Sequence, residues 1–235
     1  METAFGKRLD RVRQASPLVH CISNLVTAND CANVVLAAGA SPIMADAPEE
    51  VREITALSRA LCLSLGTPNP RKADAMFLAG RKAAELGLPV VFDPVGVGAS
   101  AYRQEIARKL LQDIPLTVLR CNASELQTLS GQSLVSRGVD AGKAPELETL
   151  LLLAGRFAAA HHCIVAVTGA EDIVTDGTTA YGIRSGTPLL RQVTGTGCML
   201  SVLTAAFVGA NPEAPLEAAA AAVCMMAVSY THLRA

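Results

Sequence analysis

Short apolar segments alternate along this chain with longer segments that have the pattern of helices, and this alternation limits the possible fold. Two parallel strands need a crossover connection between them, usually a helix. The alternation therefore predicts an α/β domain with a doubly wound, mostly parallel sheet and helices on both faces. Strands are predicted over residues 17–23, 60–65, 88–92, 116–119 and 163–167, a hairpin at Asp176–Gly177 between 173–175 and 178–183, and helices over 28–38, 70–86, 102–111, 123–129, 146–160, 199–208 and 216–232.

The residues at two helix ends support this assignment. Gly39 and Gly87 follow predicted helices, and glycine at that place commonly adopts the left-handed conformation that ends a helix. Asn69 and Pro70 form the pattern of a capping residue followed by proline at the first helical position.

The composition suits one large domain, taken as residues 1–235. Hydrophobic residues make up 51% of the chain and aromatic residues 3%, so we expect an interior of Ala, Val, Leu and Ile between helices and a buried sheet. Lys and Arg number 20 against 21 Asp and Glu. Because the chain has no excess of positive charge, its composition does not indicate binding to nucleic acid or to an anionic membrane. The expected partner is therefore a small molecule.

The cysteines indicate a reducing compartment. Their number is odd and there is no C-x-x-C pair, which argues against a disulfide framework or a zinc site. Residues 1–16 are polar and have no apolar signal core, and the longest apolar stretch, 216–228, contains Glu217 and is too short to span a bilayer. We therefore expect a cytoplasmic protein that does not enter a membrane. The seven cysteines stand at positions 21, 31, 62, 121, 163, 198 and 224.

The run from Thr194 to Cys198, with Gly195 and Gly197 inside it, joins a glycine-rich turn to the start of an apolar helix. Glycines let backbone N–H groups approach a phosphate, and the first turn of a helix offers unpaired donors and the positive end of the dipole. A thiol at a helix start is predicted to have a lowered pKa, which makes Cys198 a candidate base or nucleophile. The alternative is a tight turn followed by a small buried cysteine.

Residues suited to phosphate or metal chemistry follow the other predicted strands. Ligands of open α/β sheets bind beyond the carboxyl ends of the strands. Asp93 follows residues 88–92 and Glu125 lies beyond 116–119, and these two carboxylates could hold Mg²⁺ directly or through waters. Arg120 could clamp phosphate oxygens, and Thr168 could donate to them.

Each of these residues also has a purely structural explanation. Asp93 could form a turn before proline, Glu125 could cap a helix, and Arg120 could make a surface ion pair. Thr168 could belong to a plain turn that ends a strand. Their convergence at strand ends favours a nucleotide site over unrelated turns. No G-x-x-x-x-G-K-[ST] is present, and Gly96–Val97–Gly98 lacks a third glycine, so neither a Walker-type kinase nor a Rossmann dehydrogenase is expected.

Taken together, several segments resemble the hydroxyethylthiazole kinase family of thiamine salvage, which has the ribokinase-like fold. The resemblance runs from about Leu9 to Ala227. Cysteine at position 198, where the superfamily usually has aspartate, combines with H-x-I-x-N and P-I-M-A to indicate the thiazole branch. The segments are His20–Cys21–Ile22–Ser23–Asn24 with the helix that follows, Ala40–Ser41–Pro42–Ile43–Met44–Ala45, Asp93–Pro94–Val95–Gly96, Asn122–Ala123–Ser124–Glu125, Val167–Thr168–Gly169 and Thr194–Gly195–Thr196–Gly197–Cys198.

The resemblance implies a three-layer sandwich that uses ATP and Mg²⁺ to phosphorylate the primary alcohol of 4-methyl-5-(2-hydroxyethyl)thiazole. It also implies a homotrimer with thiazole sites at subunit boundaries. The implied roles are Cys198 as proton acceptor, Arg120, Thr168, Gly195 and Gly197 for ATP, Asn24, Met44 and Gly195 for the thiazole, and Asp93 and Glu125 for Mg²⁺.

The chain also departs from the family pattern. Ser64 stands where the family has asparagine, and Cys121 where it has glycine. The last seven residues do not resemble the family, and we expect the family's C-terminal end to be missing. The alternative functions are a sugar or hydroxymethylpyrimidine-type kinase or a nucleotide-dependent dehydratase, each with aspartate at position 198, and a non-catalytic thiazole-binding fragment. His20 is expected to be a hydrogen-bonded histidine of the core or pocket wall.

Overall fold

The computed structural model describes residues 4–131, 146–184 and 192–231. Its strands form one eight-stranded sheet of order β2-β1-β3-β4-β5-β6-β7-β8. The first six strands in this order are parallel, and β7 and β8 are antiparallel to their neighbours, which confirms the mostly parallel sheet and the hairpin. The strands are β1 (Leu18–Ile22), β2 (Ser41–Ile43), β3 (Ala60–Ser64), β4 (Val90–Asp93), β5 (Val118–Asn122), β6 (Ile164–Thr168), β7 (Asp172–Thr175) and β8 (Ala180–Ile183).

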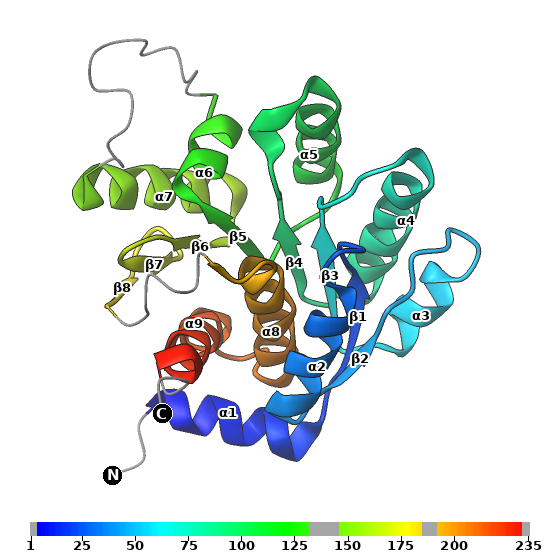
Figure 1. The fold of residues 1–235 in the computed structure, drawn as a ribbon, viewed down its shortest axis with the longest axis horizontal. Helices are drawn as coiled ribbons and strands as arrows, with labels where there is room; N and C mark the ends of the chain where they lie inside the picture. Colours follow the sequence, from blue (N-terminus) through cyan, green and yellow to red (C-terminus); the bar gives the residue numbers. More distant parts are fainter. Residues whose placement is uncertain (1–3, 132–145, 185–191, 232–235) are drawn as a thin grey trace.

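Helices cover both faces of the sheet (Figure 1). Strand β3 shows how the two cores form, because Cys62 packs into one of them and its neighbours Leu61 and Leu63 pack into the other. One face carries α1 (Ala4–Ala15), α2 (Ala28–Ala38), α8 (Thr196–Ala210) and α9 (Pro215–Thr231). The other carries α3 (Val51–Leu57), α4 (Pro70–Leu86), α5 (Ala101–Asp113), α6 (Ala123–Leu129) and α7 (Leu147–His161), with a 3₁₀ turn at η1 (Val97–Ala99).

The predicted helix ends are confirmed. Gly39 and Gly87 have φ values of 95° and 65°, in the left-handed region that glycine tolerates. The side chain of Asn69 accepts a hydrogen bond from the backbone N–H of Lys72, and Pro70 begins α4.

Some boundaries differ from the prediction. Strand β5 continues to Asn122, so Arg120 lies inside a strand and not after it. Helix α8 begins at Thr196, within the glycine turn. The helix predicted over 216–232 corresponds to α9 as far as Thr231, and its last residue lies outside the described residues.

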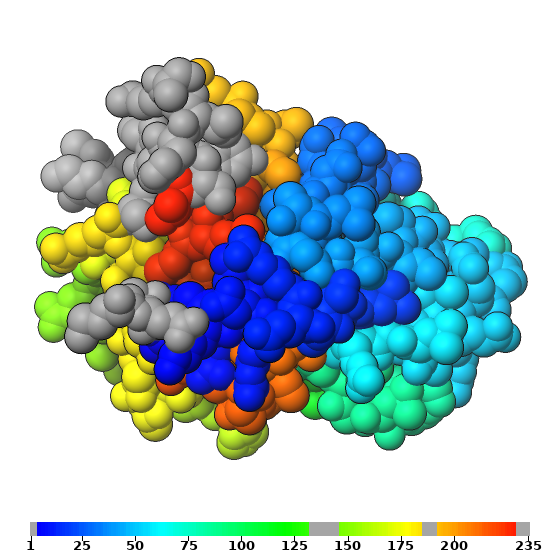
Figure 2. All heavy atoms as spheres, turned by 90° about the horizontal axis from the view of Figure 1, so that it is seen from below, coloured from blue at the N-terminus to red at the C-terminus, as the bar shows by residue number. Residues whose placement is uncertain are grey.

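The elements α1, α3 and β2 were not expected from the sequence. Helix α1 has a mostly polar composition and packs through Val12, while Arg8 pairs with Glu213 and Glu217 at 2.8 and 2.5 Å. Figure 2 shows α1, in dark blue, lying against the orange and red segments of the C-terminal part of the chain, and α1 contacts α8 and α9. No helix in the part of the chain that the structure describes is long and apolar enough to cross a membrane.

Candidate active site

The glycine turn brings the start of α8 against side chains from two other parts of the chain. Gly195 has a φ of 82°, and a Cβ added there would lie 2.3 Å from Cγ2 of Thr27. A Cβ on Gly197 would lie 2.6 Å from Nη1 of Arg120. Only glycine fits these two positions without movement. The turn therefore places the first turn of α8, with the positive end of its dipole, close to Thr27 and Arg120.

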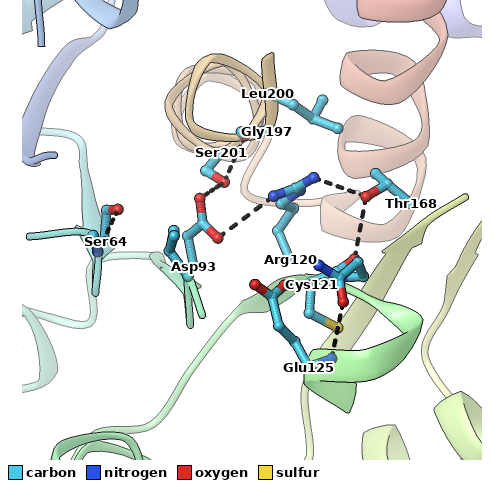
Figure 3. A network of polar contacts seen from close by, with 12 residues as sticks. Ser64, Asp93, Arg120, Cys121, Glu125, Thr168, Gly197, Leu200 and Ser201 are labelled. Carbon is cyan, nitrogen blue, oxygen red and sulfur yellow. Dashed lines mark hydrogen bonds and ion pairs between the residues drawn. The ribbon is translucent and has the colours of Figure 1, made fainter. Parts of the chain in front are cut away.

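Arg120 joins the ends of three adjacent strands below α8 (Figure 3). Its Nη2 donates to Oγ1 of Thr168 at 2.8 Å, and its Nη1 lies 3.5 Å from Oδ1 of Asp93. Ser201 of α8 donates to the other carboxylate oxygen of Asp93 at 2.8 Å. The Arg120 side chain is 11% exposed and that of Asp93 is fully buried, so the alternative of a surface ion pair is wrong. The structure thus brings Asp93, Arg120 and Thr168 together at one edge of the sheet.

Burial is the largest influence on the pKa values of Asp93 and Arg120. It raises the pKa of Asp93, although Arg120, Ser201 and Cys198 oppose the rise. Burial also works to lower the pKa of Arg120, but the charges of Asp93 and Glu125 outweigh it and the pKa is raised. Nε of Arg120 is buried and has no hydrogen-bond partner among the described residues. The guanidinium therefore keeps an unused donor.

Glu125 is engaged by the backbone at the start of α6. One carboxylate oxygen accepts from the N–H of Gly96 and the other from the N–H of Asn122, each at 2.9 Å. The Asn122 side chain accepts from the N–H of Glu125 in return, which completes a capping box. Glu125 therefore caps helix α6, as its structural alternative predicted. Burial raises the pKa of Glu125, the two backbone N–H groups oppose the rise, and Asp93 adds to it.

Cys198 lies in the first turn of α8 and is 7% exposed. The expectation of a lowered pKa is wrong, because burial and the nearby Asp93 charge raise the pKa of the thiol to about 11, against the effect of a hydrogen bond with Thr27. The cost of burying a thiolate exceeds the benefit of the helix dipole here. Cys198 is therefore a neutral thiol at pH 7.

Asn24 and Met44 follow β1 and β2, which are neighbours in the sheet. Oδ1 of Asn24 accepts from the N–H of Val26 at 3.0 Å, and Met44 is 39% exposed. The loop of Asn24 also carries Thr27, which contacts Gly195 and Cys198. The asparagine thus lies on the loop that reaches the start of α8.

His20 has the structural role expected of it. It is fully buried, with Nδ1 2.9 Å from Oγ1 of Thr55 and Nε2 2.8 Å from the carbonyl oxygen of Ala45. Burial lowers its pKa, although the contact with Ala45 opposes this. His20 therefore supports the segment that follows Met44.

Three further residues of this edge were not identified from the sequence. Thr27 precedes α2, Ser201 binds Asp93, and Lys72 is buried in α4. A signal existed for two of them. Ser201 is a polar residue within an apolar helix, and Lys72 has the helical spacing of the buried Met76 and Ala83.

Comparisons with known proteins show the family and the fold of this chain. The model of the hydroxyethylthiazole kinase family matches residues 9–234. A hydroxyethylthiazole kinase of Clostridium acetobutylicum is 45% identical over 227 residues, which cover 94% of this chain and 83% of the relative. The structure of a hydroxyethylthiazole kinase protein from Pyrococcus horikoshii has a TM-score of 0.84 at 38% identity, covering 93% of this chain and 81% of that one. A ribokinase-like superfamily protein of Enterococcus faecalis, at 12% identity and a TM-score of 0.63, covers 96% of this chain and 86% of its own and shares the fold.

Proposed function

We propose that this chain, which belongs to the hydroxyethylthiazole kinase family and has its activity, transfers the phosphoryl group at the start of α8. The activity is the ATP-dependent phosphorylation of a thiazole alcohol in thiamine biosynthesis, on a ribokinase-like fold. The observation that carries the proposal is the convergence of Asp93, Arg120 and Thr168 below the glycine turn.

The ATP phosphates are assigned to the groups that hold an anion here. Gly195 and Gly197 let backbone N–H groups approach the phosphoryl oxygens, and the α8 dipole favours negative charge at the same point. No group of the described residues accepts a hydrogen bond from the buried Nε of Arg120, and Thr168 already shares a hydrogen bond with the guanidinium. Phosphoryl transfer depends chiefly on such positioning and charge neutralisation.

The donor set fits a magnesium ion bound mainly by phosphates and water. Burial raises the pKa of both Asp93 and Glu125, Asp93 adds to the rise for Glu125, and Arg120 is the cation that opposes the rise for both carboxylates. Their oxygens already accept hydrogen bonds from the chain, which leaves lone pairs for metal-bound waters. Asp93 and Glu125 would hold Mg²⁺ in this indirect way. Bound there, the ion would neutralise charge on the phosphates.

The thiazole is assigned to the edge that carries Asn24, Met44 and Gly195. The thioether of Met44 suits a flat sulfur heterocycle. Leu25 and Val26, next to Asn24, are 73% and 65% exposed. Apolar side chains exposed beside a site are typical of a surface covered by another subunit. They support a subunit boundary at the thiazole site, and the assembly that we propose is a homotrimer.

A phosphoryl-transfer assay tests the function directly. With ATP and Mg²⁺, we expect turnover of the thiazole alcohol to exceed that of a hydroxymethylpyrimidine or ribose by at least about tenfold. Addition of a chelator in excess of Mg²⁺ should abolish it. Preference for the pyrimidine or the sugar would show that the substrate assignment is wrong.

Cys198 is proposed as the proton acceptor of the attacking hydroxyl. Because its pKa is about 11, the thiolate fraction, and with it kcat, should rise about tenfold per pH unit between roughly pH 7 and 9. Cys198→Ala should lower kcat about 100-fold, remove this pH dependence and leave the KM for ATP within about twofold. A variant that retains the pH dependence, or loses only ATP affinity, would exclude the assigned role. Cys163→Ala, at a buried cysteine on the other face of the sheet, is the matched control.

A further inference from the structure

Lys72 is a lysine in a core position. It lies in the first turns of α4 and is only 3% exposed, on the face that also buries Met76 and Ala79. Lysine is almost never fully buried unless its charge is paired or hydrogen-bonded. The ammonium group must therefore be held by something at this place.

Two backbone carbonyls hold it. Nζ of Lys72 donates to the carbonyl oxygen of Ser23 at 2.7 Å and to that of Gly66 at 2.6 Å. Ser23 directly follows β1 and Gly66 lies two residues beyond β3, and these strands are paired in the sheet. Hydrogen bonds from a charged donor are about twice as strong as neutral ones. Lys72 therefore ties together the ends of two neighbouring strands.

The residue next to each carbonyl contacts its counterpart on the other strand end. Asn24 follows Ser23 and Thr67 follows Gly66, and Oγ1 of Thr67 lies 3.5 Å from Oδ1 of Asn24. A Cβ on Gly66 would lie 2.6 Å from Nδ2 of Asn24, so the amide of the asparagine lies directly against Gly66. Thr67 has a φ of 46°, an unfavourable conformation for a β-branched residue that needs support from its surroundings. The Lys72 ammonium holds the peptides on both sides of this contact.

We propose that Lys72 is a positioning residue for the thiazole alcohol, which acts by fixing Asn24 against Gly66 and Thr67. The proposal rests on the proposed function, which assigns Asn24 to the thiazole. Lys72 is not expected to touch the substrate. Its loss should therefore weaken binding of the alcohol without a matching effect on ATP.

The charge of Lys72 provides a second measurable property. Burial lowers the pKa of Lys72 to about 8, although Asp46 and the thiols of Cys198 and Cys62 oppose the shift and Arg103 adds to it. Below this pH the ammonium is present. As the pH rises through about 8 the charge is lost and both hydrogen bonds weaken. In the wild-type protein the KM for the thiazole alcohol should therefore rise above pH 8.

The variant that tests this is Lys72→Met, and the control is Lys82→Met, at a partly buried lysine of the same helix that pairs with Glu85. At pH 7 we expect Lys72→Met to raise the KM for the thiazole alcohol about tenfold and to leave kcat and the KM for ATP within about twofold. Its KM should no longer change between pH 7 and 9. Lys82→Met should behave as wild type. In an Asn24→Ala background, Lys72→Met should add less than twofold.

Several results would overturn the proposal. These are an unchanged KM for the alcohol in Lys72→Met, equal effects on both substrates, and full additivity with Asn24→Ala. If circular dichroism shows that Lys72→Met does not fold, the wild-type pH profile decides, and a KM independent of pH from 7 to 9 rejects the proposal. If the wild type has no kinase activity, the proposed function fails. Calorimetric titration of the thiazole alcohol into wild type at pH 7 and 9 then decides on Lys72, and equal affinities reject its role.

Discussion

Replacing Arg120 with methionine is expected to lower kcat/KM for phosphoryl transfer about a thousandfold. The guanidinium lies between Asp93 and Thr168, directly below Gly197, where the proposed site needs positive charge for the phosphates. Removal of one such charged donor from a kinase site typically costs two to three orders of magnitude or more, about 3–4 kcal/mol. Steady-state kinetics with both substrates varied measures the loss.

The same substitution should also destabilise the protein. Asp93 is fully buried, and removal of its cationic partner leaves a buried charge uncompensated, which costs about 3–5 kcal/mol of unfolding free energy. The double variant Arg120→Met/Asp93→Asn should recover most of this stability in a urea titration and none of the activity. Arg184→Met, which breaks an exposed ion pair with Glu171, is the matched control and should change neither property. Recovery of activity in the double variant would mean that neither Arg120 nor Asp93 takes part in the reaction and that both serve the fold alone.

The sheet could be predicted because its strands are buried on both faces. Strand β3 is a continuous apolar run between turn residues, and such runs are recognisable without knowledge of their neighbours. Helix α1 and strand β2 could not be predicted in this way. Helix α1 has a single fully buried residue, Val12, and its ion-pair partners lie more than 200 positions away in the chain. The three-residue β2 is defined only by its pairing with β1.

The candidate site was predictable where it depends on topology. Parallel strands end at one edge, so the proximity of Asp93, Arg120 and Thr168 follows from their places on β4, β5 and β6. The pKa of Cys198 was not predictable, because it depends on how deeply the thiol is buried and on the distance to Asp93. The spacing of Lys72 within its helix indicates that it is buried, but its role was not predictable, since its partners are backbone carbonyls that carry no sequence signal.

Gly195→Ala is expected to reduce kcat/KM by at least about a hundredfold. The new methyl group would lie 2.3 Å from Cγ2 and 2.9 Å from Cβ of Thr27, so the first turn of α8 must move and its N–H groups lose their alignment with the phosphates. The φ of 82° adds a backbone strain of about 1–2 kcal/mol.

Two further variants separate the steric effect at Gly195 from the backbone strain. Gly87→Ala places alanine at a φ of 65°, and apart from its own helix and chain neighbours no atom of the described residues lies within 4 Å of the new Cβ, so the variant should lose stability and keep full kinase activity. In the Gly195→Ala background, Thr27→Ser removes the contact with Cγ2 and keeps the hydroxyl. The double variant should be about tenfold more active than Gly195→Ala, while the activity and stability lost through backbone strain should not recover. Kinetics and urea titration of the wild type, Gly195→Ala, Gly87→Ala and Gly195→Ala/Thr27→Ser measure the steric effect and the backbone strain. If Thr27→Ser restores nothing, the loss does not arise from the contact between Gly195 and Thr27, and the close packing of these two residues has no part in aligning the phosphate-binding turn.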